Sequence, residues 1–347
     1  MTNRSESDFA HFFVTDLLRH LKWLETRRIA VLRNVKILFV VMGGIALAAL
    51  GIREAFGLSW FFVLVTGILC FGGGSGVYRF LISGYVHEFK TEIIQRIVGF
   101  IDPGLTYTSG DHISARDFHS SRIFTHFPDR IRGDDMVEGT IGSTAVRFSE
   151  VHAEYRTKSS NRGEDGGRYR TIFKGLFFMA EFNKKFCGKT VVLPDTAERV
   201  LGGLGSVIQG LNKSRGELIR MDNPDFEKHF VVYGDDQIES RYVLSTSLEE
   251  RILEFRRKTG KRIYLSFVGS VVFVAIPYRR SLLEPRVFSS ITTFRSVREC
   301  FDDLLLALSI VADLNLNTRI WAGATAGDES TQASTLRSNW QELKPRI

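Results

Sequence analysis

The sequence predicts an α+β protein: an N-terminal transmembrane helical hairpin followed by a cytoplasmic antiparallel β-rich domain with packed helices. Two long apolar segments lie close together near the N-terminus. Beyond them, β-branched and aromatic segments are separated by turn signals, and runs of strands are followed by helical segments. This order favours an antiparallel sheet with helices over a doubly wound parallel sheet.

The composition is that of a globular protein with an ample core, since 44% of the 347 residues are hydrophobic and 24% are charged. Cys70, Cys187 and Cys300 lie far apart without C-x-x-C spacing, which indicates neither a disulfide framework nor a zinc module. The formal net charge of +7 is a mild imbalance, and basic residues cluster beside the apolar segments. We therefore expect membrane lipids as partners, and no nucleic acid.

The first apolar segment is Val35–Ile52, in which only Lys36 is charged, and the second is Phe56–Tyr78, which has no charge. A helix of about 20 residues crosses a hydrocarbon core of about 30 Å. We predict two transmembrane helices, 35–52 and 56–78, within residues 35–80. The length and lack of charge disfavour two buried helices of a soluble fold.

Basic residues flank this predicted hairpin at its open end, whereas its tip offers only Arg53. Because basic residues remain on the cytoplasmic side, both termini and the main domain are predicted to be cytoplasmic. A cleaved signal peptide ending near Ala46-Leu47-Ala48 is the alternative, but the charged region before it is too long. The flanking basic residues are Arg27, Arg28, Arg33, Lys36 and Arg79.

Helical periodicity extends to both sides of the hairpin. Within residues 1–34, an amphipathic cytoplasmic helix is predicted over 8–33, and it either lies on the membrane surface or packs on protein. After the hairpin, residues 81–102 are predicted to form a helical stalk that ends before Pro103. The apolar stripes are Phe9, Phe13, Leu17, Leu21 and Leu24 in the first helix, and Tyr85, Phe89, Ile93, Ile97 and Ile101 in the stalk.

Residues 103–321 form the predicted α+β domain. Tight turns at Gly142-Ser143 and Gly269-Ser270 indicate two hairpins, and Ser114 is a helix N-cap. Strands are predicted at 136–141, 144–157, 169–181, 189–193 and near 228–244, with the first four in a meander. Helices are predicted from Ala115, at Thr196–Leu211, at Leu248–Lys258 behind Ser247, and at Val297–Leu314 behind Ser296.

This order of elements recurs loosely, which suggests two similar halves, 103–214 and 215–321. Residue identity between them is too low to establish a repeat. After them, residues 322–347 are small and polar, and we predict a disordered tail.

Two short motifs carry residues suited to chemistry. His152 and Glu154 alternate along a predicted strand beside Tyr155, so they share a face as an acid/base pair or as a solvated strand face. Asp235 and Asp236 follow Gly234 between predicted strands, and they either bind a cation or form a turn. In both cases the non-catalytic interpretation is favoured.

Two further patterns are weaker. Gly205 and Gly210 precede Lys213-Ser214, but a phosphate-binding loop requires the second glycine next to the lysine. His112, His119 and His126 are evenly spaced in a polar stretch without converging carboxylates. We therefore predict no cofactor and no metal site.

Several short motifs are distinctive in combination. They are His152 to Tyr155, Phe173 to Phe177, Val192 to Asp195, Phe226 to Tyr233, Asp235 to Gln237, and Leu314 to Trp321. Together with the predicted hairpin, they resemble an uncharacterised bacterial family of two-span membrane proteins, a domain of unknown function sometimes mislabelled galanin. The resemblance extends over about residues 20–321. It implies a bacterial inner-membrane location and no established activity, and the family's association with LemA-type membrane proteins implies an envelope partner.

The sequence thus favours a non-enzymatic binding, scaffold or regulatory module in the cytoplasm, anchored in the bacterial inner membrane. The alternative is a membrane-tethered enzyme that uses His152 with Glu154, or Asp235 with Asp236. No nucleophile elbow or metalloprotease helix is present in the sequence.

Overall fold

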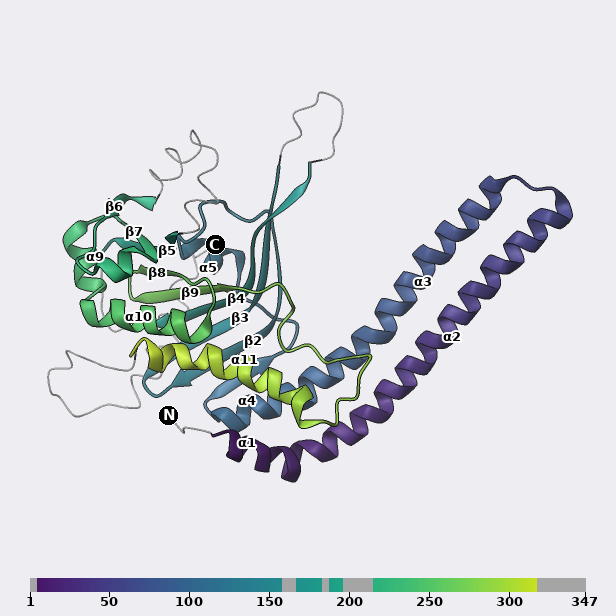
Figure 1. Cartoon of the computed structure of the whole chain (residues 1–347), viewed down its shortest axis with the longest axis horizontal. Coiled ribbons are helices and arrows are strands. Elements are labelled where there is room, and N and C mark those ends of the chain that lie inside the picture. Colours follow the sequence, from purple (N-terminus) through teal and green to yellow (C-terminus); the bar gives the residue numbers. More distant parts are fainter. Residues whose placement is uncertain (1–4, 158–166, 183–186, 196–214, 317–347) are drawn as a thin grey trace, which may run out of the picture. The chain divides into compact units, whose positions relative to one another are not determined.

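The computed structural model describes residues 5–157, 167–182, 187–195 and 215–316 (Figure 1). Two units divide the chain: a helical unit of residues 2–109 and 281–305, and a sheet unit of residues 110–280 and 306–347. The predicted helix at Thr196–Leu211, the Gly205 to Ser214 motif and the 322–347 tail lie outside the described residues.

The helical unit begins with α1 (Glu6–Phe12), which the capping box of Ser5 and Asp8 initiates. A π-helical turn, η1 (Phe13–Leu17), joins it to α2 (Leu18–Phe56). Phe9 stacks on Phe301 with ring centroids 3.9 Å apart. The apolar stripe therefore packs on protein within this unit, as one of the two alternatives expected. Its buried residues are Phe9, Phe13, Leu17, Leu21 and Leu24.

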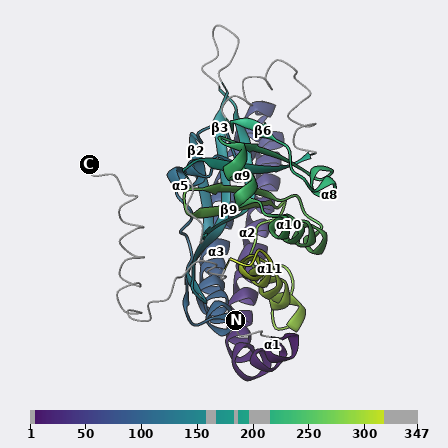
Figure 2. The ribbon, with the colours of Figure 1, turned by 90° about the vertical axis from the view of Figure 1, so that its left-hand side faces the viewer.

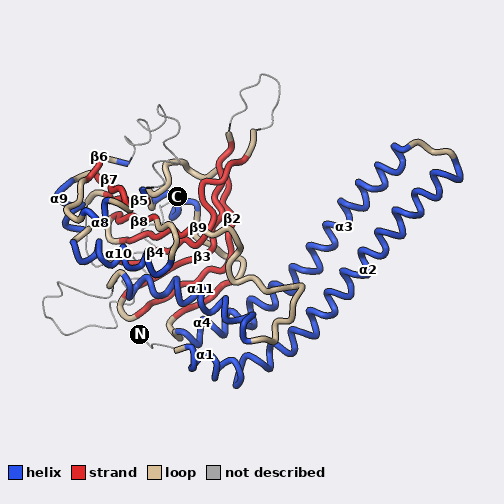
Figure 3. The backbone as a smooth tube through the Cα atoms, in the orientation of Figure 1, coloured by secondary structure: helices blue, strands red, loops and turns tan. Residues whose placement is uncertain are grey.

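Helix α3 (Trp60–Phe89) returns alongside α2 as an antiparallel hairpin (Figures 1 and 3). Gly57, in the left-handed conformation (φ 64°), ends α2, and the Ser59 hydroxyl accepts a hydrogen bond from the Phe61 amide at 3.2 Å. The prediction that Phe56 begins the second span was wrong: Phe56 is the last residue of α2. The charged residues Arg53 and Glu54 do not end the helix, because charged side chains are compatible with a helix. The helix ends at Gly57, because glycine readily adopts the left-handed conformation of a C-cap.

Both helices of the hairpin are long and apolar enough to cross a membrane. The most apolar 18-residue stretch is only 11% buried in the helix that ends at Phe56, and only 6% buried in the helix that begins at Trp60. Gly74 allows a close approach, since a Cβ there would lie 2.3 Å from the Met42 sulfur on α2. The apolar side chains that the hairpin exposes include Phe39, Val40, Leu47, Phe61, Leu64, Leu69, Phe71 and Phe80.

The helical stalk continues from α3 through η2 (Lys90–Ile94) into α4 (Gln95–Ile101), and a short strand, β1 (Leu105–Thr108), follows. The helix ends at Ile101, with Asp102 as its C-cap, and so it ends before Pro103 as predicted. Lys90 is 1% exposed and forms an ion pair with Glu284 at 2.9 Å. The predicted stripe of Tyr85, Phe89, Ile93, Ile97 and Ile101 is buried.

The strands of the sheet unit form one antiparallel sheet in the order β2-β3-β4-β9-β8-β5-β7-β6. Both predicted hairpin turns are present, with Gly142 at φ 62° and Gly269 at φ 61°. The strands are β2 (Arg130–Ile141), β3 (Thr144–Arg156), β4 (Tyr169–Glu181), β5 (Lys189–Pro194), β6 (Glu217–Ile219), β7 (Phe230–Gly234), β8 (Tyr264–Val268) and β9 (Val271–Pro277).

The predicted meander extends only through β2, β3 and β4. Strand β4 pairs with β9, while β5 lies between β8 and β7, so the fourth predicted strand is not a neighbour of the third. Strands of the predicted halves 103–214 and 215–321 therefore alternate in one sheet. Non-local pairing decides this order, and hairpin signals in the sequence report only adjacent strands.

Helices α5 (Ala115–Ser120) and α10 (Thr246–Thr259) lie on opposite sides of these strands (Figure 2). Phe118 of α5 packs on Phe177 of β4, with ring centroids 5.1 Å apart, in a core cluster that includes Ile123 and Tyr233. On the opposite face, the Arg256 guanidinium of α10 lies over the Phe230 ring. We call the first of these faces the α5 face.

Three sequence predictions about secondary structure require correction. The predicted strand near 228–244 is β7 followed by α9 (Gln237–Val243), since Asp236 provides an N-cap. Helix α10 begins behind Ser245 rather than Ser247, because the Ser245 carbonyl accepts the first helical hydrogen bonds. Helix α11 (Phe294–Asp313) begins before Ser296, whose hydroxyl donates to the Ile291 carbonyl instead of capping the helix.

Candidate functional site

Strand β3 presents the residues of the first predicted motif on two faces, because side chains alternate along a strand. His152 and Glu154 share one face. Tyr155 lies on the other, where its ring contacts His126 with centroids 4.8 Å apart. The site therefore contains His152 and Glu154 but does not contain Tyr155.

Cross-strand pairing surrounds His152 and Glu154 with basic side chains. On β2, Arg132 is opposite His152 and Arg130 is opposite Glu154; on β4, Lys174 is opposite His152. We call this set the cross-strand cluster: Arg130, Arg132, His152, Glu154, Thr171 and Lys174. It holds three permanent cations and one carboxylate, so its charge is positive with neutral histidine.

The contacts within the cluster are those of an ion pair and not of a proton relay. Arg132 donates to the Glu154 carboxylate at 2.9 Å. His152 Nε2 lies 3.1 Å from the Thr171 hydroxyl and 3.6 Å from Glu154 Oε1. In a relay, the nucleophile and the acid contact different ring nitrogens, whereas here both contact Nε2.

The electrostatics agree with this assignment. Burial lowers the pKa of His152, and the nearby Glu154 carboxylate partly opposes that effect. The hydrogen bond from Arg132 lowers the pKa of Glu154, so this carboxylate is ionised at neutral pH. The imidazole is correspondingly neutral, and the cluster keeps an excess of positive charge.

The Asp235-Asp236 pair has local bonding roles. Asp236 caps α9 by accepting a hydrogen bond from the Glu239 amide at 2.7 Å. Asp235 accepts from the Lys189 amide at 3.2 Å and pairs with the Lys189 ammonium at 3.1 Å. The Glu239 carboxylate in turn accepts from the Cys187 and Gly188 amides. These carboxylates attach α9 to the start of β5, and they bind different donors rather than one shared proton.

The predicted flanking basic residues differ in their surroundings within the helical unit. Arg27 pairs with Glu88 at 2.7 Å, and this contact raises the pKa of Arg27. Arg28 is buried, pairs with Glu25 at 2.6 Å and donates to the Val287 carbonyl. Four are exposed: Arg27, Arg33, Lys36 and Arg79.

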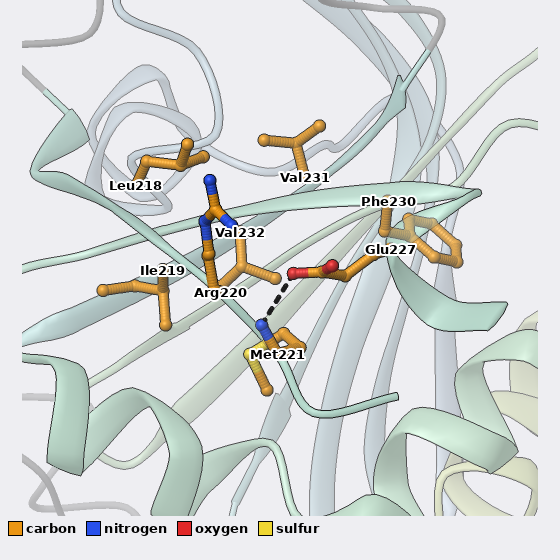
Figure 4. Close-up of a pocket in the computed structure, with 8 residues that line it drawn as sticks. All are labelled: Leu218, Ile219, Arg220, Met221, Glu227, Phe230, Val231 and Val232. Carbon is orange, nitrogen blue, oxygen red and sulfur yellow. Dashed lines mark hydrogen bonds between the residues drawn. The ribbon is translucent and has the colours of Figure 1, made fainter. Parts of the chain in front are cut away.

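A pocket of about 200 Å³ lies where β6 separates from β7 (Figure 4). It lies beyond the last β6–β7 pair, Ile219 with Val232. Glu227 of α8 (Pro224–Glu227) accepts a hydrogen bond from the Met221 amide at 2.9 Å across it. No sequence motif indicated this pocket, since its walls come from a strand end, a loop and a four-residue helix. Its lining is Leu218, Ile219, Arg220, Met221, Glu227, Phe230, Val231 and Val232.

The evenly spaced histidines, His112, His119 and His126, do not converge on one site. The His119 ring contacts Phe127, with centroids 5.0 Å apart, and His126 contacts Tyr155. Over the described ranges, no group of three His, Cys, Asp or Glu side chains is arranged to hold a metal ion.

Fold and site together define an α+β protein with a membrane-length helical hairpin and a positively charged strand surface. Residues 171–316 match the family model described as a protein of unknown function, DUF3137. The chain therefore contains a DUF3137 domain, which confirms its resemblance to a domain of unknown function. The match includes Asp235 and Asp236 but begins after His152, Glu154 and Tyr155.

Comparison with curated proteins gives no significant match. Among solved structures, the chain is similar to the crystal structure of the mycobacterial trehalose monomycolate transport factor A, TtfA, at 13% sequence identity and a TM-score of 0.29. The similarity covers 61% of this chain and 94% of that one.

Proposed function

We propose that this protein is a non-enzymatic, membrane-anchored module that binds an acidic partner through the cross-strand cluster. The observation that carries the proposal is the clustering of Arg130, Arg132 and Lys174 around one carboxylate on three adjacent strands. Positive surfaces attract and orient acidic partners, and Glu154, the carboxylate of this cluster, is paired with Arg132 and is not poised for acid-base work.

The exposed apolar surface of α2 and α3 supports the anchoring part of the proposal. The exposed cations Arg33, Lys36 and Arg79 lie towards its open end, while Arg53 near its tip is paired with Glu54. By the positive-inside rule, both termini and the sheet unit face the cytoplasm. The resemblance to a family of two-span membrane proteins supports our proposal that this hairpin lies in a bacterial inner membrane. We propose a LemA-type membrane protein as the first candidate partner.

Labelling with a membrane-impermeant maleimide tests this topology. In a variant without native cysteines, we expect Leu58→Cys, at the hairpin tip, to react in intact cells. Thr108→Cys, beyond the stalk, should react only after the cells are opened. Reaction of both, or of Thr108→Cys alone, in intact cells contradicts the proposed orientation.

Cross-linking in living cells tests the binding role. The informative variant is Arg130→Gln with Lys174→Gln, because Glu154 keeps its partner Arg132. We expect partner recovery, measured by mass spectrometry after affinity purification, to fall at least about tenfold with the loss of two charges. The matched control is Arg116→Gln with Arg257→Gln, two exposed cations elsewhere on the sheet unit. Equal recovery with both variants contradicts the proposal.

A further inference from the structure

Arg215, immediately before β6, is a buried cation on the sheet unit. Its side chain is 8% exposed, and it donates to the Ile123 carbonyl through a long contact of 3.3 Å. The Nε–H group is buried without a hydrogen-bond partner. Within the part of the chain that the structure describes, no carboxylate forms an ion pair with this guanidinium.

The other buried cations of the described residues are paired. Arg28 is also 8% exposed, and it forms an ion pair with Glu25 at 2.6 Å. Lys90 is 1% exposed and pairs with Glu284 at 2.9 Å. Burying a charge is costly unless a counter-charge and hydrogen bonds compensate it. Arg215 therefore differs from the buried cations of the helical unit in lacking this compensation.

The surroundings of Arg215 are aromatic and aliphatic. Tyr233 of β7 and Tyr264 of β8 are near enough to raise the pKa of Arg215 electrostatically. Tyr233 belongs to the core cluster of the α5 face, and Tyr264 packs against that cluster. Phe124 adds its ring 6.0 Å from that of Tyr264. Burial lowers the pKa of Arg215, but a guanidinium remains protonated at physiological pH. One positive charge thus lies among apolar surfaces and two phenol groups.

The pocket at the end of β6 is close to this site in the sheet register. Leu218, which lines the pocket, is directly opposite Tyr233. Val231, also in the lining, lies two residues before Tyr233 and therefore on the same face of β7. The pocket therefore borders Tyr233, one of the two tyrosines that act electrostatically on Arg215.

We propose that Arg215 binds the carboxylate of an apolar monoanion, whose hydrocarbon part occupies the pocket beside Leu218 and Val231. A carboxylate matches the guanidinium fork in geometry and balances its single charge. A polyphosphate would bring more negative charge than this one cation compensates. The proposal is independent of acidic-partner binding by the cross-strand cluster, which lies on β2, β3 and β4.

Thermal unfolding of the full-length chain in nanodiscs tests this site, with octanoate as the probe and its neutral analogue octanamide as the ligand control. We expect octanoate to raise the Tm by at least about 2 °C, because a ligand that binds the folded state stabilises it. Octanamide and inorganic phosphate should leave the Tm unchanged. Equal stabilisation by octanamide, or stabilisation by phosphate in place of octanoate, overturns the carboxylate assignment.

The deciding variant is Arg215→Met, with Arg116→Met as the matched control on an exposed arginine outside the pocket lining. Arg215→Met should keep or raise the Tm without ligand, because it removes a buried unpaired charge, and should lose the octanoate shift. Arg116→Met should keep the shift. If the Arg215→Met variant still folds but its Tm without ligand falls sharply, Arg215 has a structural role through its bond with Ile123, and the proposal is overturned.

If Arg215→Met does not fold, Arg215→Lys decides the question, because lysine keeps the charge and loses the planar fork. A smaller octanoate shift than in the wild type supports the carboxylate site. An unchanged shift overturns it.

Discussion

Glu249, in the first turn of α10, shows how burial changes the chemistry of one residue. Its side chain is 3% exposed and its Oε2 atom has no hydrogen-bond partner among the described residues. Burial, and then repulsion from Asp222, Glu227 and Glu250, raises its pKa to about 7. The ordinary value is 4.5, so the folded protein holds a proton that the unfolded chain releases.

This shift predicts a pH-dependent stability. Because the folded-state pKa is raised, the contribution of Glu249 is complete below about pH 4.5 and is lost as the pH rises through about 7. Glu249→Gln should match the wild type near pH 5 and exceed it at pH 8 by up to about 3 kcal/mol. Thermal or denaturant unfolding at both pH values measures the difference.

The neighbouring residue provides the control for this effect. Glu250→Gln, at an exposed position, should show little of the gain at pH 8. A Glu249→Gln variant whose stability follows that of the wild type at every pH contradicts burial of an unpaired carboxyl.

The cap role of Asp236 makes a second residue-level prediction. Asp236→Ala should lower the free energy of unfolding by about 1 kcal/mol, because α9 loses the acceptor for the Glu239 amide. Asp236→Asn should retain stability and biological function, since asparagine caps equally well without an acid. Loss of function in a folded Asp236→Asn variant instead favours the alternative in which this carboxylate is catalytic.

At the scale of elements, the pairing of β4 with β9 depends on Gly175. A Cβ there would lie 2.2 Å from the Ile276 carbonyl oxygen, and the residue has φ 154°. Gly175→Ala should therefore destabilise the protein by more than about 3 kcal/mol, because backbone atoms of the sheet must separate. The measurement is the unfolding midpoint in denaturant.

The turn between β8 and β9 is the matched control for this prediction. Gly269 has φ 61°, but a Cβ at this position would meet open space, since no atom lies within 4 Å of it. Gly269→Ala should lower the free energy of unfolding by only about 1–2 kcal/mol, the cost of the left-handed conformation for alanine. Similar losses at both positions contradict a steric role for Gly175.

For the whole molecule, the exposed apolar hairpin leads to a prediction about membrane anchoring. Leu64 and Phe71 on α3 are 57% and 76% exposed. A lysine at a membrane helix centre costs about 2.5–3.5 kcal/mol, so Leu64→Lys with Phe71→Lys should release the chain from carbonate-washed membranes. Leu64→Ala with Phe71→Ala should remain in the membrane pellet. Membrane retention of the lysine variant contradicts transmembrane anchoring.

Local signals made much of the fold predictable. The N-cap at Ser114 and the turns at Gly142-Ser143 and Gly269-Ser270 depend on a few adjacent residues, and all are present. The candidate site was less accessible to sequence reasoning. Alternation along β3 placed His152 beside Glu154, but Arg130, Arg132 and Lys174 join them only through pairing with other strands.

By itself, the sequence determined the two apolar helices, the buried stripes that flank them and the α+β class, because periodicity and turn chemistry act over short distances. Only the tertiary structure decided that β5 lies between β8 and β7, and that Arg215 is buried without a carboxylate partner among the described residues. These features depend on which distant segments pack together. Burial and strand pairing then set the charge balance that the same side chains experience.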